Sequence, residues 1–318
     1  MPVIDLSRET ARQVVVAART KTNYREQVNT VLMADGETMF ATWSIGHGGK
    51  AGPMKKSTYG GRTWSVLLPT PANWRGISSC PCIFRITDRT GAKRLIVLAG
   101  RGRLDQSLSL DTGCTWSPMK LNGLFKPGGN TVIIPIGNGG RRLLLAHRRP
   151  IGKLQTKKTQ AIWQDTSDDG GQTWTHYRKV CEVSGTVPCE PELIRSPDGR
   201  QLLCLMRENS RRIDSLYMIS NEKGKTWNKA CELTAGHYVA WIDRYADIIR
   251  GREGQYRVKL LHHHGAPGDC GYSGLECLPN GIMVATTYIK YSPGPEKNSI
   301  ISVRFQLKEI DAKAPRKG

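Results

Sequence analysis

Long apolar runs and long helical periodicity are both missing from this 318-residue chain. No segment approaches the roughly 20 consecutive apolar residues of a membrane-spanning helix, so no membrane span is expected. The opening MPVIDLSRET also lacks the apolar core of a signal peptide. The sequence as written therefore predicts a cytoplasmic protein, or a secreted or periplasmic one if a leader has been removed.

Aromatic residues are scarce, whereas turn-forming residues are plentiful. Phe, Trp and Tyr make up 7% of the chain, against 34 glycines and 17 prolines. This balance is typical of many short strands joined by tight turns, and it indicates an all-β fold. Because large all-β domains often exceed the usual length of about 100–200 residues, a single domain over residues 1–318 is expected.

Zinc-ligand spacing is also absent, although the chain has nine cysteines. Cys80-Pro81-Cys82 is too tight for the usual pair of ligands. Others lie in strand-like runs, for example Cys204 and Cys277. Most are therefore predicted to be reduced and to pack as small apolar side chains. No metal and no cofactor are expected.

Acidic residues are the scarcer charge, with 27 Asp and Glu against 47 Lys and Arg, a formal net charge of +20. Such an excess attracts anions, so nucleic acid, acidic glycans and membrane surfaces are compatible partners, and a role in solubility alone is equally open. Apart from the tail, residues 308–317, the basic residues are scattered. That distribution argues against a dedicated nucleic-acid arm, and no specific nucleic acid is expected as a partner.

Four segments of eight residues align without gaps. Each begins with Ser, has Gly at its fifth position and ends in Thr-Trp; they span residues 57–64, 109–116, 167–174 and 220–227. Their tryptophans are 52, 58 and 53 residues apart. That spacing corresponds to one four-stranded propeller blade per copy.

The repeated unit has the chemistry of a hairpin turn. A Ser or Asp oxygen accepts hydrogen bonds from the amides of its own turn, and Gly supplies a positive φ. Thr and Trp begin the returning strand, with the indole packed under the turn. Tyr59 and Glu222 replace Asp in the first and fourth copies, so those two turns are expected to be looser.

A second unit, strand–turn–strand, precedes each copy and returns after the last one at Pro279-Asn280-Gly281. The two units together predict a six-bladed all-β propeller with four Asp-box hairpins. Its blades are expected near residues 29–64, 81–116, 131–174, 190–227, 235–265 and 270–307. The strand Gln13–Val16 is expected to complete the last blade, which removes the open edges.

Across about residues 20–307 the sequence resembles the exo-α-sialidases, and more closely the bacterial sialidase-like proteins with Asp-box repeats. The closer match is carried by residues 189–209 (CEPELIRSPDGRQLLCLMREN), 251–261 and 269–291. The resemblance implies a glycoside hydrolase that releases terminal sialic acid or a related acidic sugar. Asp-boxes also occur in propellers that are not enzymes, so function depends on the site.

The resemblance implies a nucleophilic Tyr activated by a Glu. The family's Tyr-Ser-x-Leu segment is matched at Tyr272, and the Glu that opens a strand leading to an arginine is matched by Glu190 and Arg207. Glu192, two residues on, is a rival for the base. A neutral phenol suits this chemistry because an anionic nucleophile would be repelled by the carboxylate of the sugar.

The family holds the substrate carboxylate with three arginines, whose planar guanidinium groups bind it bidentately. Arg25, after Tyr24, resembles the first arginine, and Arg207 the second. Residues 228–249 contain no strand–turn–strand unit of the kind that leads to the third, so Arg244 is the remaining candidate. Asp269 is expected to orient the loop of Tyr272 or to contact the ligand.

The family's general acid, an Asp on a first-blade loop, has no counterpart in residues 43–57. His47, between two glycines, is the candidate proton donor, with a purely structural histidine as the alternative. Where the family often has another Asp, the chain has Ser79-Cys80. These departures leave two further hypotheses open. One is a non-catalytic or degenerate propeller that binds sialylated or other acidic glycans, and the other is a polyanion-binding scaffold.

Overall fold

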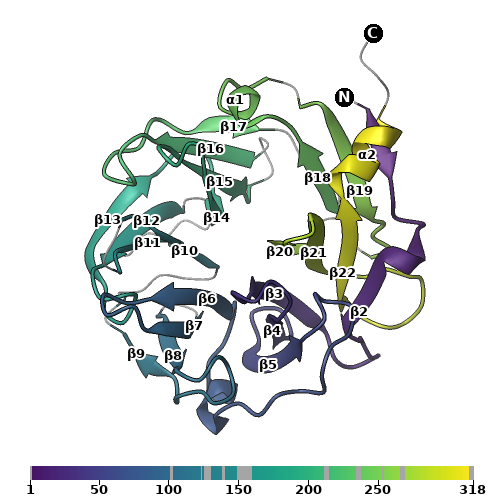
Figure 1. The fold of residues 1–318 in the computed structure, drawn as a ribbon, viewed down its shortest axis with the longest axis horizontal. Coiled ribbons are helices and arrows are strands. Elements are labelled where there is room, and N and C mark those ends of the chain that lie inside the picture. The colour runs from purple at the N-terminus through teal and green to yellow at the C-terminus, as the bar shows by residue number, and fades with distance from the viewer. Residues whose placement is uncertain are drawn as a thin grey trace. The chain divides into compact units, whose positions relative to one another are not determined.

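The computed structural model describes residues 2–100, 103–122, 124, 130–137, 140–148, 160–210, 215–233, 238–252, 254–265 and 269–314. The regular elements of these residues are mainly strands, which confirms the all-β prediction. The strands form six sheets, drawn in Figure 1. The chain divides into two compact units, a first unit of residues 1–70 with 236–318 and a second unit of residues 71–235. A single domain over residues 1–318 stays a prediction.

The first unit holds three sheets. One has the order β3 (Arg25–Leu32), β4 (Met39–Ile45) and β5 (Lys50–Ser57). Another has the order β2 (Gln13–Ala17), β22 (Ser299–Gln306), β21 (Ile282–Ile289) and β20 (Gly271–Cys277). The third has the order β1 (Val3–Asp5), β19 (Tyr256–Leu261) and β18 (Tyr238–Ile242). Short helices are η1 (Thr10–Arg12), α1 (Tyr245–Ile248) and α2 (Leu307–Lys313).

Two features of the first unit bear on the sequence predictions. The N-terminal strand β2 pairs antiparallel with β22, as predicted for the last sheet (Figure 1). The hairpin expected before Tyr272 exists as β18 and β19, which pair antiparallel. Its strands are joined through α1 rather than by a tight Asp-Gly turn, and its second strand begins after residue 249. Both strands lie within residues 235–265, where a fifth blade is expected from the sequence, but the tight turn of the family pattern is replaced by α1.

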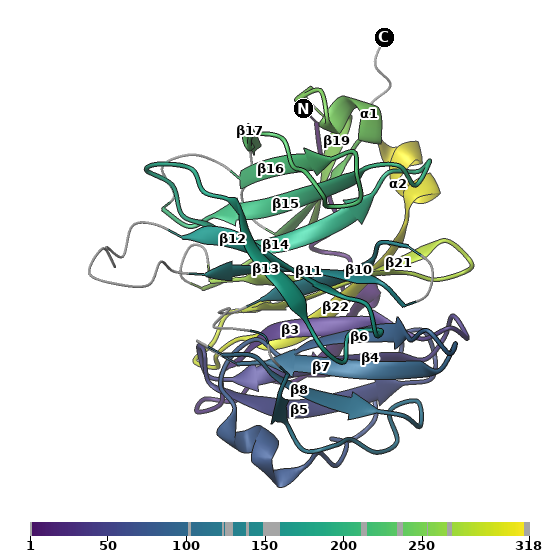
Figure 2. The same cartoon turned by 90° about the vertical axis from the view of Figure 1, so that its left-hand side faces the viewer.

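The second unit holds three four-stranded antiparallel sheets in which consecutive strands pair (Figure 2). The first contains β6 (Cys82–Thr87), β7 (Lys93–Ala99), β8 (Asp105–Ser109) and β9 (Lys120–Leu121). The second contains β10 (Thr131–Pro135), β11 (Arg142–Arg148), β12 (Ala161–Ser167) and β13 (Thr175–Cys181). The third contains β14 (Pro188–Arg195), β15 (Leu202–Glu208), β16 (Ser215–Ser220) and β17 (Cys231–Leu233). A 3-10 helix, η2 (Ala72–Gly76), precedes β6.

Neighbouring sheets within each unit pack face to face. In the second unit, Leu143 and Leu145 of one sheet share a core cluster with Leu202 and Cys204 of the next. In the first unit, Ala41 and other residues of β3 and β4 cluster with residues of β2, β21 and β22. Strands such as β7 and β15 are therefore buried over most of their length, and their residues form continuous apolar runs rather than an alternating pattern.

The four repeated segments form turns with one shared contact. In each copy the Ser hydroxyl accepts the amide of the glycine four residues on, at 2.7–2.9 Å, and that glycine has a φ of 75–90°. The contacts join Ser57 to Gly61, Ser109 to Gly113, Ser167 to Gly171 and Ser220 to Gly224. Other residues would be strained at this φ, which explains the invariant glycine of the repeat.

The four turns differ in the hydrogen bonds made by the residue at the third position of the repeated segment. Asp111 and Asp169 each accept both the amide and the hydroxyl of the Thr four residues on. Glu222 accepts only the hydroxyl of Thr226, at 2.9 Å, and Tyr59 has no carboxylate to offer. The Ser contact is therefore common to all four turns, whereas the carboxylate contacts are complete in two.

None of the eight cysteines whose side chains the structure describes forms a disulfide with another of them. Five are buried, namely Cys80, Cys82, Cys181, Cys189 and Cys204. Burial raises the pKa of Cys82 to about 11, so this thiol stays protonated near neutral pH. Among the described residues, no group of three or more His, Cys, Asp or Glu is arranged to hold a metal ion, and no helix has the length and apolarity to cross a membrane.

Candidate functional site

The first strand of three sheets begins with the same backbone irregularity. Strands β3, β14 and β20 each pair with the next strand through a register shift near their N-terminal ends. Inside each shift lies a non-glycine residue with φ of 51°: Gln27, Glu190 and Tyr272. Bulges re-aim side chains, and strained φ values of this kind concentrate at functional sites. The N-terminal ends of these strands are therefore the first places to search for a site.

Glu26 lies at the bulge of β3 and is fully buried. Its Oε1 accepts the amide of Gly48 at 2.6 Å, and its Oε2 lies 2.7 Å from Nδ1 of His47. Burial raises the pKa of Glu26, and the nearby charge of Asp269 raises it further, while His47 and the Gly48 amide act in the opposite direction. A buried carboxylate with two partners of this kind is costly to maintain, which is typical of functional positions.

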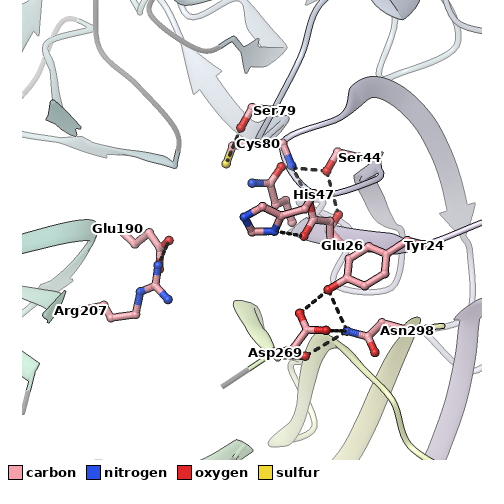
Figure 3. Close-up of polar contacts among 12 residues, drawn as sticks. Tyr24, Glu26, Ser44, His47, Ser79, Cys80, Glu190, Arg207, Asp269 and Asn298 are labelled. Carbon is pink, nitrogen blue, oxygen red and sulfur yellow. Dashed lines mark hydrogen bonds and ion pairs between the residues drawn. The ribbon is translucent and has the colours of Figure 1, made fainter. Parts of the chain in front are cut away.

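His47 is the solvent-facing member of this pair. Its side chain is 77% exposed, whereas that of Glu26 is 0% exposed. The carboxylate fixes Nδ1, so the imidazole presents Nε2 outward. Gly46 and Gly48, with φ of 84° and 63°, form the turn that carries the ring. The arrangement holds one imidazole nitrogen in place and leaves the other ready to exchange a proton (Figure 3).

Tyr24, Asp269 and Asn298 form a second polar cluster in the first unit (Figure 3). The Tyr24 hydroxyl donates to Oδ1 of Asp269. The amide nitrogen of Asn298 donates to Oδ2 of Asp269 at 3.2 Å and to its backbone carbonyl at 3.0 Å. Burial and the bond to Asp269 raise the pKa of Tyr24 far above its usual range. Tyr24 therefore remains a neutral phenol that orients Asp269.

Tyr272 lies three residues beyond Asp269, at the strained position of β20. It is half-buried, and its ring centroid is 6.1 Å from that of Tyr288. Preceding it, Gly271 has a φ of 153° and its carbonyl accepts the hydroxyl of Thr287 at 2.8 Å. The backbone before Tyr272 is thus held by β21, and the Tyr272 ring lies near that of Tyr288.

Among the described residues, the Arg25 and Arg244 side chains form no hydrogen bond or ion pair with the clusters around Glu26 and Asp269, although the Arg25 backbone amide donates to the carbonyl of Asn298 at 3.3 Å. The Arg25 Nε donates to the carbonyl of Ala18 at 3.5 Å, and burial lowers the pKa of its guanidinium. Arg244 is exposed at the N-cap of α1, where its backbone amide donates to Asp243. Their roles as carboxylate-binding arginines stay predictions.

Glu190 and Arg207 form an ion pair in the second unit. The Arg207 Nη2 donates to Oε1 of Glu190 at 2.5 Å, and the two residues lie on the neighbouring strands β14 and β15 (Figure 3). Glu192, the rival for the base, lies on the exposed side of β14, where its carboxylate accepts the amide of Leu193 at 3.1 Å. The bulge gives Glu190 and Glu192 different partners although they are two residues apart.

Ser79 and Cys80, before β6, are both buried and both have positive φ, of 74° and 42°. The Ser79 hydroxyl donates to the Cys80 sulfur at 3.4 Å. Two consecutive non-glycine residues therefore lie in the left-handed region, which is unfavourable for both. Neither side chain is an acid, in agreement with the departure from the sialidase pattern that the sequence shows.

Within the first unit, sequence reasoning selected His47 and Asp269 but missed the side chains that hold them, Glu26, Tyr24 and Asn298. No sequence signal marks Glu26, because β3 also contains the polar residues Arg25, Asn29 and Thr30, although the structure buries Glu26 and Gln27. Tyr272 belongs to the first unit and Glu190 to the second. A hydrogen bond between them, and a shared cleft for Arg25 and Arg207, stay predictions.

No protein-family model matches the chain, and no curated protein matches its sequence. Solved structures do match its fold. An α-L-arabinofuranosidase from Fusarium graminearum superposes with a TM-score of 0.68 at 11% identity, covering 94% of this chain and 99% of that one. A protein of unknown function from Dyadobacter fermentans gives 0.69 at 15% identity, covering 92% and 98%.

The NanB sialidase from Streptococcus pneumoniae matches less completely, with a TM-score of 0.56 at 12% identity over 93% of this chain and 70% of that one. The arabinofuranosidase and the sialidase are both propeller-type glycosidases. At these identities the likeness concerns the fold, and several four-stranded antiparallel sheets are its common element.

Proposed function

We propose that this chain is a glycoside hydrolase of sialidase type, built as a six-bladed propeller with Asp-box hairpins over residues 1–318. Tyr272 acts as the nucleophile and Glu190 as its base, while His47 donates the proton to the leaving group. The likeness of the fold to propeller-type glycosidases supports the reaction class. The residue roles rest on the observations that follow.

One observation carries the proposal. The two residues that the sequence pattern selected as base and nucleophile, Glu190 and Tyr272, are both strained non-glycine residues inside β-bulges. A positive φ at such residues costs about 1–3 kcal/mol each and persists only where the surroundings enforce it. A bulge of this kind re-aims the side chain that it carries, which suits a residue whose reactive group must point in one direction.

The chemistry balances over two steps. Glu190 takes the proton of the Tyr272 hydroxyl as its oxygen attacks the anomeric carbon, and the glycosidic bond breaks as His47 protonates the departing oxygen. In the second step, water attacks the anomeric carbon. His47 takes a proton from the water, and Tyr272 leaves and recovers its proton from Glu190. Glu26 holds the His47 ring throughout both steps.

An acidic sugar is the substrate class that suits this site, because the chain carries a net charge of +20 and its nucleophile is a neutral phenol. Arg207 supplies a guanidinium beside the base, and Arg25 and Arg244 are its proposed companions. An α-L-arabinofuranoside is a second candidate. The fuller superposition on the arabinofuranosidase, 99% of that chain against 70% of the sialidase, favours it.

Hydrolysis of aryl glycosides by the purified protein tests the proposal. We expect release of 4-methylumbelliferone from its α-sialoside and loss of that activity in Tyr272→Phe. Tyr291→Phe, at a half-buried tyrosine near the end of β21, is the matched control and should retain activity. Cleavage of 4-nitrophenyl α-L-arabinofuranoside instead would select the second candidate. Binding of sialyllactose with no cleavage of either aryl glycoside would favour a non-catalytic glycan-binding protein.

A further inference from the structure

A pocket of about 410 Å³ lies in the first unit, at the far end of β3 and β20 from Glu26 and Tyr272. Its walls are the β3–β4 turn at residues 35–37, the first repeated turn at residues 59–62 and the β20–β21 turn at residues 278–280, with Arg304 of β22. At about 3.3 Å per residue, β3 places Glu26 roughly 20 Å from its own C-terminal end. The pocket is therefore separate from the proposed catalytic residues.

The three turns that form the walls are packed tightly against one another. A Cβ on Gly36 would lie 2.4 Å from Cγ of Pro279, and a Cβ on Gly60 would lie 2.8 Å from Cδ1 of Leu278. Both glycines also have positive φ. The glycine backbone of two turns is thus packed against the side chains of the third turn, which fixes how the walls of the pocket lie relative to one another.

Two arginines line this pocket without an acidic partner. Among the described residues, neither Arg62 nor Arg304 forms a salt bridge. The Arg304 guanidinium donates to the carbonyl of Gly60, in the same turn that carries Arg62, so two guanidinium groups lie in one pocket. Burial and the charge of Arg62 lower the pKa of Arg304. Such a pair is unfavourable until an anion binds it, and guanidinium groups bind carboxylates bidentately.

The rest of the lining suits the body of a sugar. The Tyr59 ring is 59% exposed, and Arg62 lies over it with 5.5 Å between Cζ and the ring centroid. Asp35 uses Oδ1 to accept the amides of Glu37 and Thr38, whereas the exposed carboxylate of Glu37 accepts no hydrogen bond in the described structure. Donors for an oxyanion, an acceptor for hydroxyls and a flat aromatic face therefore lie in one pocket.

We propose that this pocket binds a carboxylated sugar residue of an acidic glycan, as a second site apart from the catalytic one. The carboxylate lies between Arg62 and Arg304, a ring face packs on Tyr59, and a hydroxyl donates to Glu37. The site does not depend on the proposed hydrolysis, because none of its residues takes part in that reaction.

Calorimetric titration of the full chain with trigalacturonic acid tests the site, with neutral galactotriose as the matched ligand. We expect binding of the acid that weakens as salt is added, and no binding of the neutral sugar. Arg62→Gln should weaken binding at least ten-fold, since a charge-assisted pair is lost, and Tyr59→Ala should weaken it several-fold. Arg8→Gln, at an exposed arginine of the same unit outside the pocket, should bind as the wild type does.

Each remaining outcome decides the proposal. Binding of 3′-sialyllactose alone, with the same loss in Arg62→Gln, would keep the carboxylated-sugar site and identify sialic acid as its sugar. Equal binding of galactotriose, absence of binding by the wild type, or unchanged affinity in both Arg62→Gln and Tyr59→Ala would overturn it. Both substituted side chains are exposed, so thermal melting of the variants should match the wild type and exclude misfolding as the cause.

Discussion

Carboxylates at the bulged starts of the strands and carboxylates in the repeated turns lie in opposite environments. Burial raises the pKa of Glu26 at the start of β3. In the second repeated turn, hydrogen bonds from the Thr115 hydroxyl and amide lower the pKa of Asp111 to about 2. The turn carboxylate is ionised, satisfied and exposed, whereas the strand carboxylate is enclosed and costly. The carboxylates of the turns therefore stabilise the fold. The buried carboxylate at the start of β3 lowers the stability of the fold, which is typical of a functional site.

The largest effect is expected at Glu190, whose backbone is strained at the start of β14. Glu190→Gln keeps the size of the side chain but cannot take a proton, so kcat/KM on an aryl glycoside should fall by about 10²–10⁴-fold. Glu192→Gln is the matched control on the same strand and should remain within a few-fold of the wild type. The reverse pattern, measured by steady-state kinetics, would make Glu192 the base.

At the start of β3, the expected effect depends on the leaving group. Glu26→Gln releases the His47 ring, so hydrolysis of a natural glycan should fall by about 10²-fold. An aryl glycoside with an acidic phenol needs little protonation and should lose less than ten-fold. Glu182→Gln, at an exposed carboxylate, should change neither substrate.

The double variant separates positioning from a merely structural role. If Glu26 acts through His47, then Glu26→Gln in a His47→Ala background should cost almost nothing more. Full additivity of the two losses, or an equal loss on both classes of leaving group, would show that Glu26 only supports the fold.

The sequence predicts the repeated elements well and the site only in part. Each repeated turn is built from contacts within eight residues, so the Ser, Gly and Asp positions carry the whole signal. Glu26 contacts His47 across 21 positions, and Tyr24 contacts Asp269 across 245. Contacts of that separation leave no local pattern. The β18–β19 hairpin lies where a fifth blade was expected, but its turn has no sequence signal, because α1 replaces the turn residues that mark the other hairpins.

Asp165 and Asp169, the turn carboxylate four residues further on, have pKa values that are shifted in opposite directions. Burial raises the pKa of Asp165 to about 7, with one opposing bond from the Thr166 amide at 2.8 Å. Its folded pKa therefore exceeds the ordinary value, 3.8. The folded state retains this proton between about pH 4 and 7 while the unfolded state loses it, so stability falls as pH rises through that window.

Asp165→Asn cannot titrate, so its stability relative to the wild type should rise by about 4 kcal/mol from pH 4 to pH 8. Urea unfolding at the two pH values measures this difference. Asp168→Asn, at a more exposed carboxylate of the same hairpin, should show no such trend. An equal offset of Asp165→Asn at both pH values would mean that Asp165 is ionised in the folded protein.

Removing a turn carboxylate that accepts both Thr hydrogen bonds should have a smaller effect on stability. Asp169→Ala leaves the Thr173 amide and hydroxyl without their acceptor, which should lower the free energy of unfolding by about 1–2 kcal/mol. Burial alone would raise the pKa of Asp169, but these bonds outweigh it and the pKa is lowered. The loss should therefore be full at neutral pH and vanish as pH falls below the folded pKa. Asp168→Ala is the control, and activity per folded molecule should not change in either variant.

The smallest effect is expected in the fourth repeated turn, where Glu222 is one methylene longer than the Asp of the second and third turns. Glu222 accepts the Thr226 hydroxyl but not its amide, while Ser220 makes the same contact as in the other copies. Glu222→Asp should bring the carboxylate over the turn and add the missing amide bond, for a gain of about 0.5–1 kcal/mol in urea unfolding. Asp169→Glu should cost a similar amount by the reverse change. Because the Ser and Gly contacts are the same in both turns, comparing the two variants measures the effect of the carboxylate position alone. A loss in Asp169→Glu without a gain in Glu222→Asp would show that the fourth turn differs in its backbone as well.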